Sequence, residues 1–124
     1  MFLEHVNVSV KDLDRSVAFY RDLLGLRVRW SGIQSAGRRG AHVGDDKHYL
    51  ALVEVGADAP DAVYDRTLTG TNHIGWVVDD LEAAKRKLQA MGIKPHQEDD
   101  YEPGARLYFF DPNGVEIELV EYQS

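Results

Sequence analysis

The sequence predicts an α+β protein built from two copies of a βαβββ module. Three observations predict this architecture. The alternating apolar stretch at residues 3–13, which opens with a histidine and ends in an Asp-Leu pair, returns at residues 71–81. The ends of the two halves also match, at residues 50–54 and 117–121. In both halves the first strand pattern leads directly into a helical pattern. We therefore expect a cleft where the two copies meet.

The first module is predicted to span residues 1–56. Residues 2–10 alternate and are rich in valine, which is typical of a strand. An apolar face with helical spacing follows over residues 14–24, and Gly25 ends it as a left-handed cap. The rest of the module is predicted as three short strands, at residues 26–30, 40–44 and 48–55, with a loop or exposed hairpin at 31–40.

Residues 57–70 contain Pro60 and Gly70 with little periodicity, and they are predicted to form a linker. The second module then spans residues 71–124 and repeats the plan of the first. Its elements are predicted as a strand at 72–78, a helix at 80–91 that Gly92 ends, strands near 93–96, 105–110 and 115–121, and an acidic surface loop at 98–102.

Composition limits the function classes. The chain has 124 residues, a net charge of −7 and a pI of about 5.1, so it lacks the basic surface that nucleic acid or an anionic membrane requires. It has no cysteine, which excludes disulfides and thiolate ligands. No secretion signal and no membrane-spanning run is visible. We expect a soluble cytoplasmic protein.

Strand alternation assigns side chains to faces. The apolar residues at alternate positions should pack under the helices, and this leaves His5, His73 and Glu118 on the opposite faces of their strands. Imidazole nitrogen and carboxylate oxygen are the ligand types for Fe, Mn, Zn, Ni or Co as divalent ions. A lone strand histidine is usually an ordinary satisfied residue, and we assign that role to His42, His48 and His96.

Four segments resemble the vicinal oxygen chelate superfamily, which includes glyoxalases, bleomycin-resistance proteins and extradiol dioxygenases. They are LEHVNV at residues 3–8, SVAFYRDLLGL at 16–26, NHIGW at 72–76 and FDPNGVEIEL at 110–119. The resemblance covers nearly the whole chain. It implies that the two modules form an open, barrel-like curved sheet.

The resemblance also implies a site and its chemistry. Members bind a divalent metal that chelates two neighbouring substrate oxygens, and His5, His73 and Glu118 occupy the ligand positions. Chains of this size often form homodimers, so a homodimer is expected, with the ligands from one chain or from two.

This sequence differs from the glyoxalase-I-like enzymes at the fourth ligand, which those enzymes carry on the last strand of the first module. The internal repeat puts Ala51 opposite Glu118, so this position has no ligand. Glu54 lies three residues further, and only a bulge would turn it to the same face. A three-ligand site is typical of extradiol dioxygenases and of fosfomycin-modifying thiol transferases. In the dioxygenases the tyrosine that matches Tyr108 donates a hydrogen bond to substrate.

Two classes of function remain open from the sequence. The first is a metal-dependent enzyme, either an oxidoreductase like the extradiol dioxygenases or a lyase or isomerase like glyoxalase I. The second is a drug-sequestering protein of the bleomycin-resistance type. Because members of the second class usually lack the ligand set, the three candidate ligands favour the enzyme.

Overall fold

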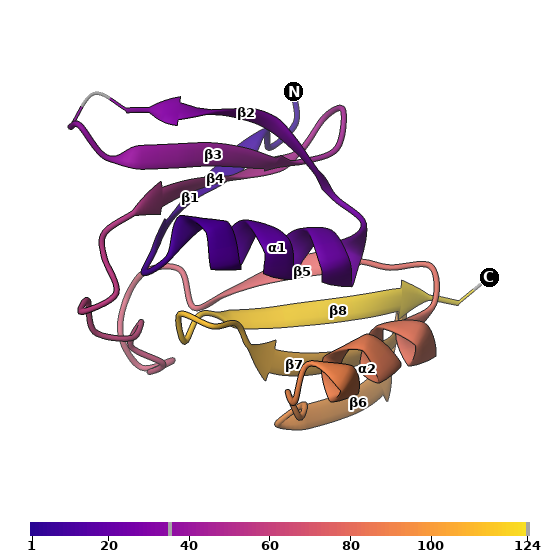
Figure 1. Ribbon diagram of the computed structural model, residues 1–124. Helices are drawn as coiled ribbons and strands as arrows, with labels where there is room; N and C mark the ends of the chain where they lie inside the picture. Colours follow the sequence, from indigo (N-terminus) through magenta and orange to yellow (C-terminus); the bar gives the residue numbers. More distant parts are fainter. Residues whose placement is uncertain (35, 124) are drawn as a thin grey trace. The chain divides into compact units, whose positions relative to one another are not determined.

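The computed structural model describes residues 1–34 and 36–123 of the chain. It confirms the α+β class and the order βαβββ, which occurs twice (Figure 1). The chain divides into two compact units, Met1–Pro60 and Asp61–Ser124.

Unit 1 is a four-stranded sheet with one helix. Its elements are β1 (His5–Val10), α1 (Leu13–Leu24), β2 (Arg27–Ile33), β3 (Arg39–Gly44) and β4 (Tyr49–Glu54). The strand order is β1-β4-β3-β2, and the β1–β4 pair is parallel while the other pairs are antiparallel. The parallel pair brings the first and last strands of the module side by side, which is what places residues from both strands at one site.

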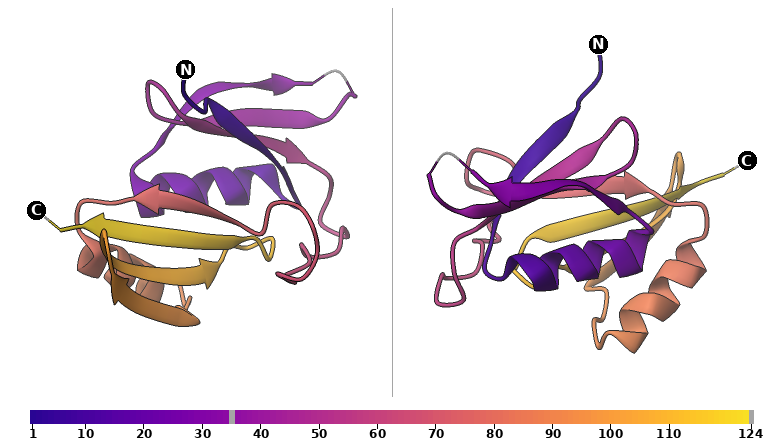
Figure 2. Two further views of the ribbon diagram at one scale, coloured as in Figure 1. Left: turned by 180° about the vertical axis from the view of Figure 1, so that it is seen from behind. Right: turned by 45° about the horizontal axis from the view of Figure 1, so that its top comes forward.

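Unit 2 repeats this topology. Its elements are β5 (His73–Val77), α2 (Leu81–Ala90), β6 (Gln97–Tyr101), β7 (Gly104–Phe110) and β8 (Glu116–Tyr122). The order is β5-β8-β7-β6, and β5 runs parallel to β8. In both views of Figure 2 each helix lies against one face of its own sheet. The other face of each sheet, which we call the non-helix face, carries the predicted ligands.

The two helices begin with the same two capping interactions. Asp12 and Asp80 are the N-caps, and their side chains accept a backbone N–H three residues on. The carboxylates of Glu54 and Glu121, each on the last strand of its unit, accept the first helical N–H at 2.9 and 2.8 Å. A carboxylate at this end also suits the helix dipole. Gly25 ends α1 in the left-handed conformation at φ 68°, as the sequence predicts.

The core of each unit lies between its helix and its sheet. Of the strand residues predicted to pack there, Val10, Ile117 and Leu119 are buried, whereas Val6, Val8, Ile74 and Trp76 are only half-buried. One face of each helix is buried with them. In unit 1 the fully buried side chains include Val10, Tyr20, Val43, Leu50 and Leu52. In unit 2 they include Leu88, Leu107, Phe109, Ile117 and Leu119.

One strand prediction is wrong. The second strand of unit 2 covers residues 97–101 rather than 93–96, so the acidic segment predicted as a loop is largely a strand. It pairs with β7 in register and its charged side chains suit an exposed sheet edge. In unit 1 the segment 31–40 was predicted as a loop or an exposed hairpin, and the hairpin agrees with the structure, because β2 continues to Ile33 and pairs antiparallel with β3 from Arg39. The part of the chain that the structure describes has no helix long and apolar enough to span a membrane.

Candidate metal centre

His73 and Glu118 come together on the non-helix face of unit 2. The parallel register sets Gly75 opposite Glu118, so the imidazole reaches across the small glycine toward the carboxylate. His73 Nε2 lies 3.0 Å from Glu118 Oε1. The histidine side chain is 25% exposed and the glutamate side chain 10% exposed, so water screens this pair only partly. The structure therefore unites two of the three predicted ligands.

The other nitrogen of His73 is held by the residue before it. Nδ1 lies 2.6 Å from the side-chain oxygen of Asn72 and 3.5 Å from Glu116 Oε1, both of which are acceptors. Nδ1 therefore donates its hydrogen to Asn72. In this tautomer Nε2 presents a lone pair to the carboxylate of Glu118, and two acceptors 3.0 Å apart repel each other unless a proton or a metal cation lies between them.

His5 has the same arrangement in unit 1. Its Nδ1 lies 2.9 Å from Oε1 of Glu4, which is again the preceding residue. The Tyr49 hydroxyl donates to the same oxygen at 3.1 Å. These bonds from His5 and Tyr49 lower the pKa of Glu4, so the carboxylate stays an acceptor. Both repeated histidines thus leave Nε2 for another partner.

His5, the third predicted ligand, belongs to unit 1. Within residues 1–34 and 36–123 no group of three or more His, Asp or Glu side chains stands ready to hold a metal ion. The pair formed by His73 and Glu118 is what the structure shows directly.

The registers of the two sheets fix which residue matches Glu118 in unit 1. Ala51 pairs with Asn7 in β1 as Glu118 pairs with Gly75 in β5. Ala51 is therefore the counterpart of Glu118, as the repeat predicts, and it offers no ligand. Glu54, which was kept as a weak alternative, is the counterpart of Glu121 and binds the start of α1.

Arg106 and Tyr108 on β7 complete the surroundings of Glu118. Arg106 Nη1 donates to Glu118 Oε2 at 2.9 Å, and its guanidinium lies 4.0 Å from the centre of the Tyr101 ring. Tyr108 pairs directly with Glu118, and its ring centre lies 5.8 Å from that of His73. Burial, followed by a hydrogen bond with Tyr101, raises the pKa of Tyr108 to about 12. Tyr108 therefore remains a neutral hydroxyl that can donate.

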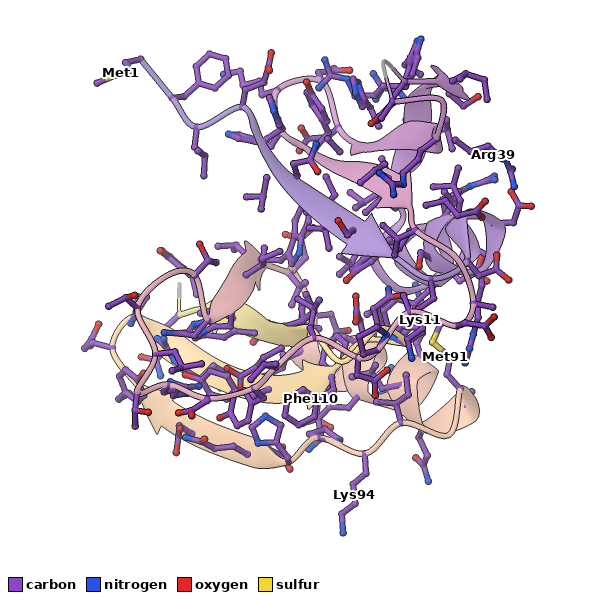
Figure 3. The ribbon with its side chains drawn as sticks, turned by 90° about the vertical axis from the view of Figure 1, so that its left-hand side faces the viewer. Met1, Lys11, Arg39, Met91, Lys94 and Phe110 are labelled. Carbon is purple, nitrogen blue, oxygen red and sulfur yellow. The ribbon has the colours of Figure 1, made fainter. Side chains whose placement is uncertain are left out.

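Sequence reasoning missed Glu116, whose side chain is fully buried beside the pair. Its two oxygens bind Arg66 Nη2 at 2.7 Å and His96 Nε2 at 2.8 Å. The His96 ring stacks on Phe110, labelled in Figure 3, with ring centres 4.7 Å apart. One signal was available, because Glu116 and Glu118 have the same parity on β8 and so share a face.

Comparisons with known proteins show which family the chain belongs to. Residues 2–119 match the Glyoxalase/Bleomycin resistance protein/Dioxygenase superfamily. The chain belongs to this superfamily. It is 32% identical to glutathione transferase FosA of Serratia marcescens, over 94% of this chain and 78% of the relative. It is 32% identical to lactoylglutathione lyase of Haemophilus influenzae, over 100% of this chain and 95% of the relative.

A solved structure of the superfamily has the same fold. It is a variant of the fosfomycin resistance protein FosX of Listeria monocytogenes in complex with Mn(II). Its TM-score to this chain is 0.72, at 19% identity, with 96% of this chain and 90% of that chain covered.

The donor pair of this superfamily member fits a divalent cation. Two ligands that bind one ion at right angles, each about 2.1 Å from it, lie about 3.0 Å apart. The observed separation of His73 Nε2 and Glu118 Oε1 is 3.0 Å. Arg106 holds the second oxygen of Glu118, which leaves Oε1 as the available donor. The chemistry of the donors and their spacing therefore suit a metal ion.

Proposed function

We propose that the protein is a divalent-metal-dependent enzyme that acts on a small substrate with vicinal oxygens. His5, His73 and Glu118 would hold the ion. The observation that carries the proposal is the pair of acceptors, His73 Nε2 and Glu118 Oε1, at 3.0 Å with the other imidazole nitrogen already bound. The same hold on Nδ1 of His5 supports the third ligand.

A bound divalent ion would supply Lewis acidity to a substrate oxygen. Imidazole and carboxylate ligands suit Fe, Mn, Zn, Ni or Co, and the Mn(II) complex of FosX supports an ion of this kind. The chain's own residues then have separate roles. Arg106 holds Glu118 in place, and the neutral hydroxyl of Tyr108 is positioned to donate a hydrogen bond to substrate.

The set of three ligands favours an extradiol-dioxygenase-like site. Ala51 fills the place of a fourth ligand, and Glu54 is engaged at the start of α1. A second candidate is a lyase or isomerase of the glyoxalase I type, which the likeness to lactoylglutathione lyase favours. The lack of a carboxylate at Ala51 weighs against it. A drug-sequestering role is less well supported, because it does not require the pair of metal donors that His73 and Glu118 form.

We further propose that the protein is a cytoplasmic homodimer. The proposal for the metal centre holds whether His5 comes from the same chain as His73 or from the partner. Analytical ultracentrifugation of metal-free and metal-loaded protein tests the dimer separately from the reaction.

One experiment tests the reaction. Protein reconstituted anaerobically with Fe(II), and in parallel with Mn(II), Ni(II) or Zn(II), is assayed against a panel of catechols and a panel of hemithioacetals. Oxygen uptake with a catechol supports the dioxygenase assignment, and proton exchange with a hemithioacetal supports the isomerase. Turnover of neither panel with any of these ions, while the substrates still bind, would favour the sequestering protein.

A further inference from the structure

Tyr49 touches His5 in two ways. The two residues lie directly opposite each other in the parallel pair of β1 and β4. Their rings stack with centres 4.9 Å apart and planes 17° from parallel. The Tyr49 hydroxyl also donates at 3.1 Å to the Glu4 oxygen that holds His5 Nδ1 at 2.9 Å. One side chain thus braces both the face of the imidazole and its hydrogen-bond acceptor.

Aromatic and cationic side chains of the neighbouring strands pack against the Tyr49 ring. The His42 ring stacks on Tyr49, with ring centres 4.4 Å apart and planes 25° from parallel. Trp30 follows with its ring centre 4.9 Å from that of His42. These separations match the spacing of neighbouring strands, about 4.8 Å, so each strand of the sheet contributes one ring to a continuous row. The Arg29 guanidinium lies 4.6 Å from the centre of the Tyr49 ring and adds a cation–π contact.

The same position in unit 2 also bears on the repeated histidine. Glu116 lies opposite His73 in the parallel pair of β5 and β8, and its Oε1 is 3.5 Å from His73 Nδ1. At the position opposite the repeated histidine, unit 1 therefore has an aromatic ring and unit 2 has a carboxylate, and both contact the histidine. This repetition argues that the position supports the histidine rather than only filling the sheet.

We propose that Tyr49, acting together with Glu4, is a positioning residue that fixes the ring of His5 so that Nε2 faces the metal. The part of this inference that concerns the ion rests on the proposed function. A carboxylate acceptor at Nδ1 fixes the tautomer of a metal-binding histidine, and stacking fixes the plane of the ring. A ring held this way loses little further rotamer entropy when it binds an ion.

The first test uses metal-free protein. Long-range proton–nitrogen NMR on isotope-labelled protein at mildly alkaline pH reports which imidazole nitrogen of His5 carries the hydrogen. Wild type should show the hydrogen on Nδ1. Tyr49→Leu should give a mixture of tautomers, and Tyr49→Phe, which keeps the stacking, should change less. The control Tyr122→Leu, an exposed tyrosine at the end of β8, should leave His5 unchanged.

The second test is Mn(II) binding by the same four proteins. Removal of a residue that orients a metal-binding side chain weakens metal binding about 10–100-fold. Tyr49→Leu should therefore bind Mn(II) more weakly by that factor. Tyr49→Phe should lose less, and Tyr122→Leu should match wild type. A folded Tyr49→Leu protein with the wild-type tautomer and the wild-type Mn(II) affinity would overturn the inference. If wild type binds no ion, the proposed function fails, while the tautomer of His5 still decides the role of Tyr49.

Discussion

His73 Nε2 lies 3.0 Å from Glu118 Oε1 while His73 Nδ1 is bound to the side chain of Asn72. The bond from Nδ1 to Asn72 determines the chemical state of Nε2 in its contact with Glu118. With Nδ1 donating to Asn72, Nε2 and the carboxylate are both acceptors, and they need a positive charge between them. This pair and three other features of the protein can be tested by measurement.

Glu54 and Glu121 should act on stability and not on metal binding. Each carboxylate accepts the first N–H of a helix, so Glu54→Ala or Glu121→Ala should lower the free energy of unfolding by about 1 kcal/mol. Urea unfolding measures this loss, and the exposed Asp58→Ala variant serves as the control. A fall in Mn(II) affinity on Glu54→Ala would instead identify Glu54 as a ligand.

Arg106 should be the counter-ion of Glu118 when no metal is bound. Both side chains are only 10% exposed, so removal of one partner leaves the other charge poorly compensated. Arg106→Met should therefore be destabilised, and added Mn(II) should raise its melting temperature more than that of wild type, since an ion at Oε1 then supplies the positive charge that the guanidinium no longer gives at Oε2. Arg86→Met, at an exposed position on α2, is the control. Equal Mn(II) stabilisation of Arg106→Met and wild type would show that the two cations do not share Glu118.

Tyr108 should make folding sensitive to alkaline pH. Burial raises its pKa to about 12, above the value of about 10 for an unfolded chain. Below pH 10 both states keep the proton and the full stability is present. As the pH rises from about 10 to about 12, the unfolded state loses this proton first, so the free energy of unfolding falls. Tyr108→Phe should lose less stability than wild type over this range, whereas the exposed Tyr122→Phe should behave as wild type does.

The repeat in the sequence predicted a good part of this site. Matching strands with period-two alternation were enough to put His73 and Glu118 on one face, and the registers confirm that Ala51 is the counterpart of Glu118. This succeeded because strand parity is a local property that one stretch of sequence already contains.

The charge pairs could not be predicted in the same way. Arg66 lies in a segment without periodicity, and its bond to Glu116 spans 50 positions of sequence. The strand at residues 97–101 was missed because acidic residues have low strand propensity, and its pairing with β7 decides the outcome. Contacts of this kind depend on how the segments pack, which the local pattern does not encode.

Metal content is the most direct test of the central claim. Wild-type protein purified without chelator, or reconstituted with a divalent ion and then desalted, is analysed for bound metal beside His73→Ala, Glu118→Ala and the exposed control His48→Ala. The account predicts a stoichiometric ion in wild type and in the control, and its loss in the other two. Wild type that takes up no ion after reconstitution, or an ion that both His73→Ala and Glu118→Ala retain, would contradict it.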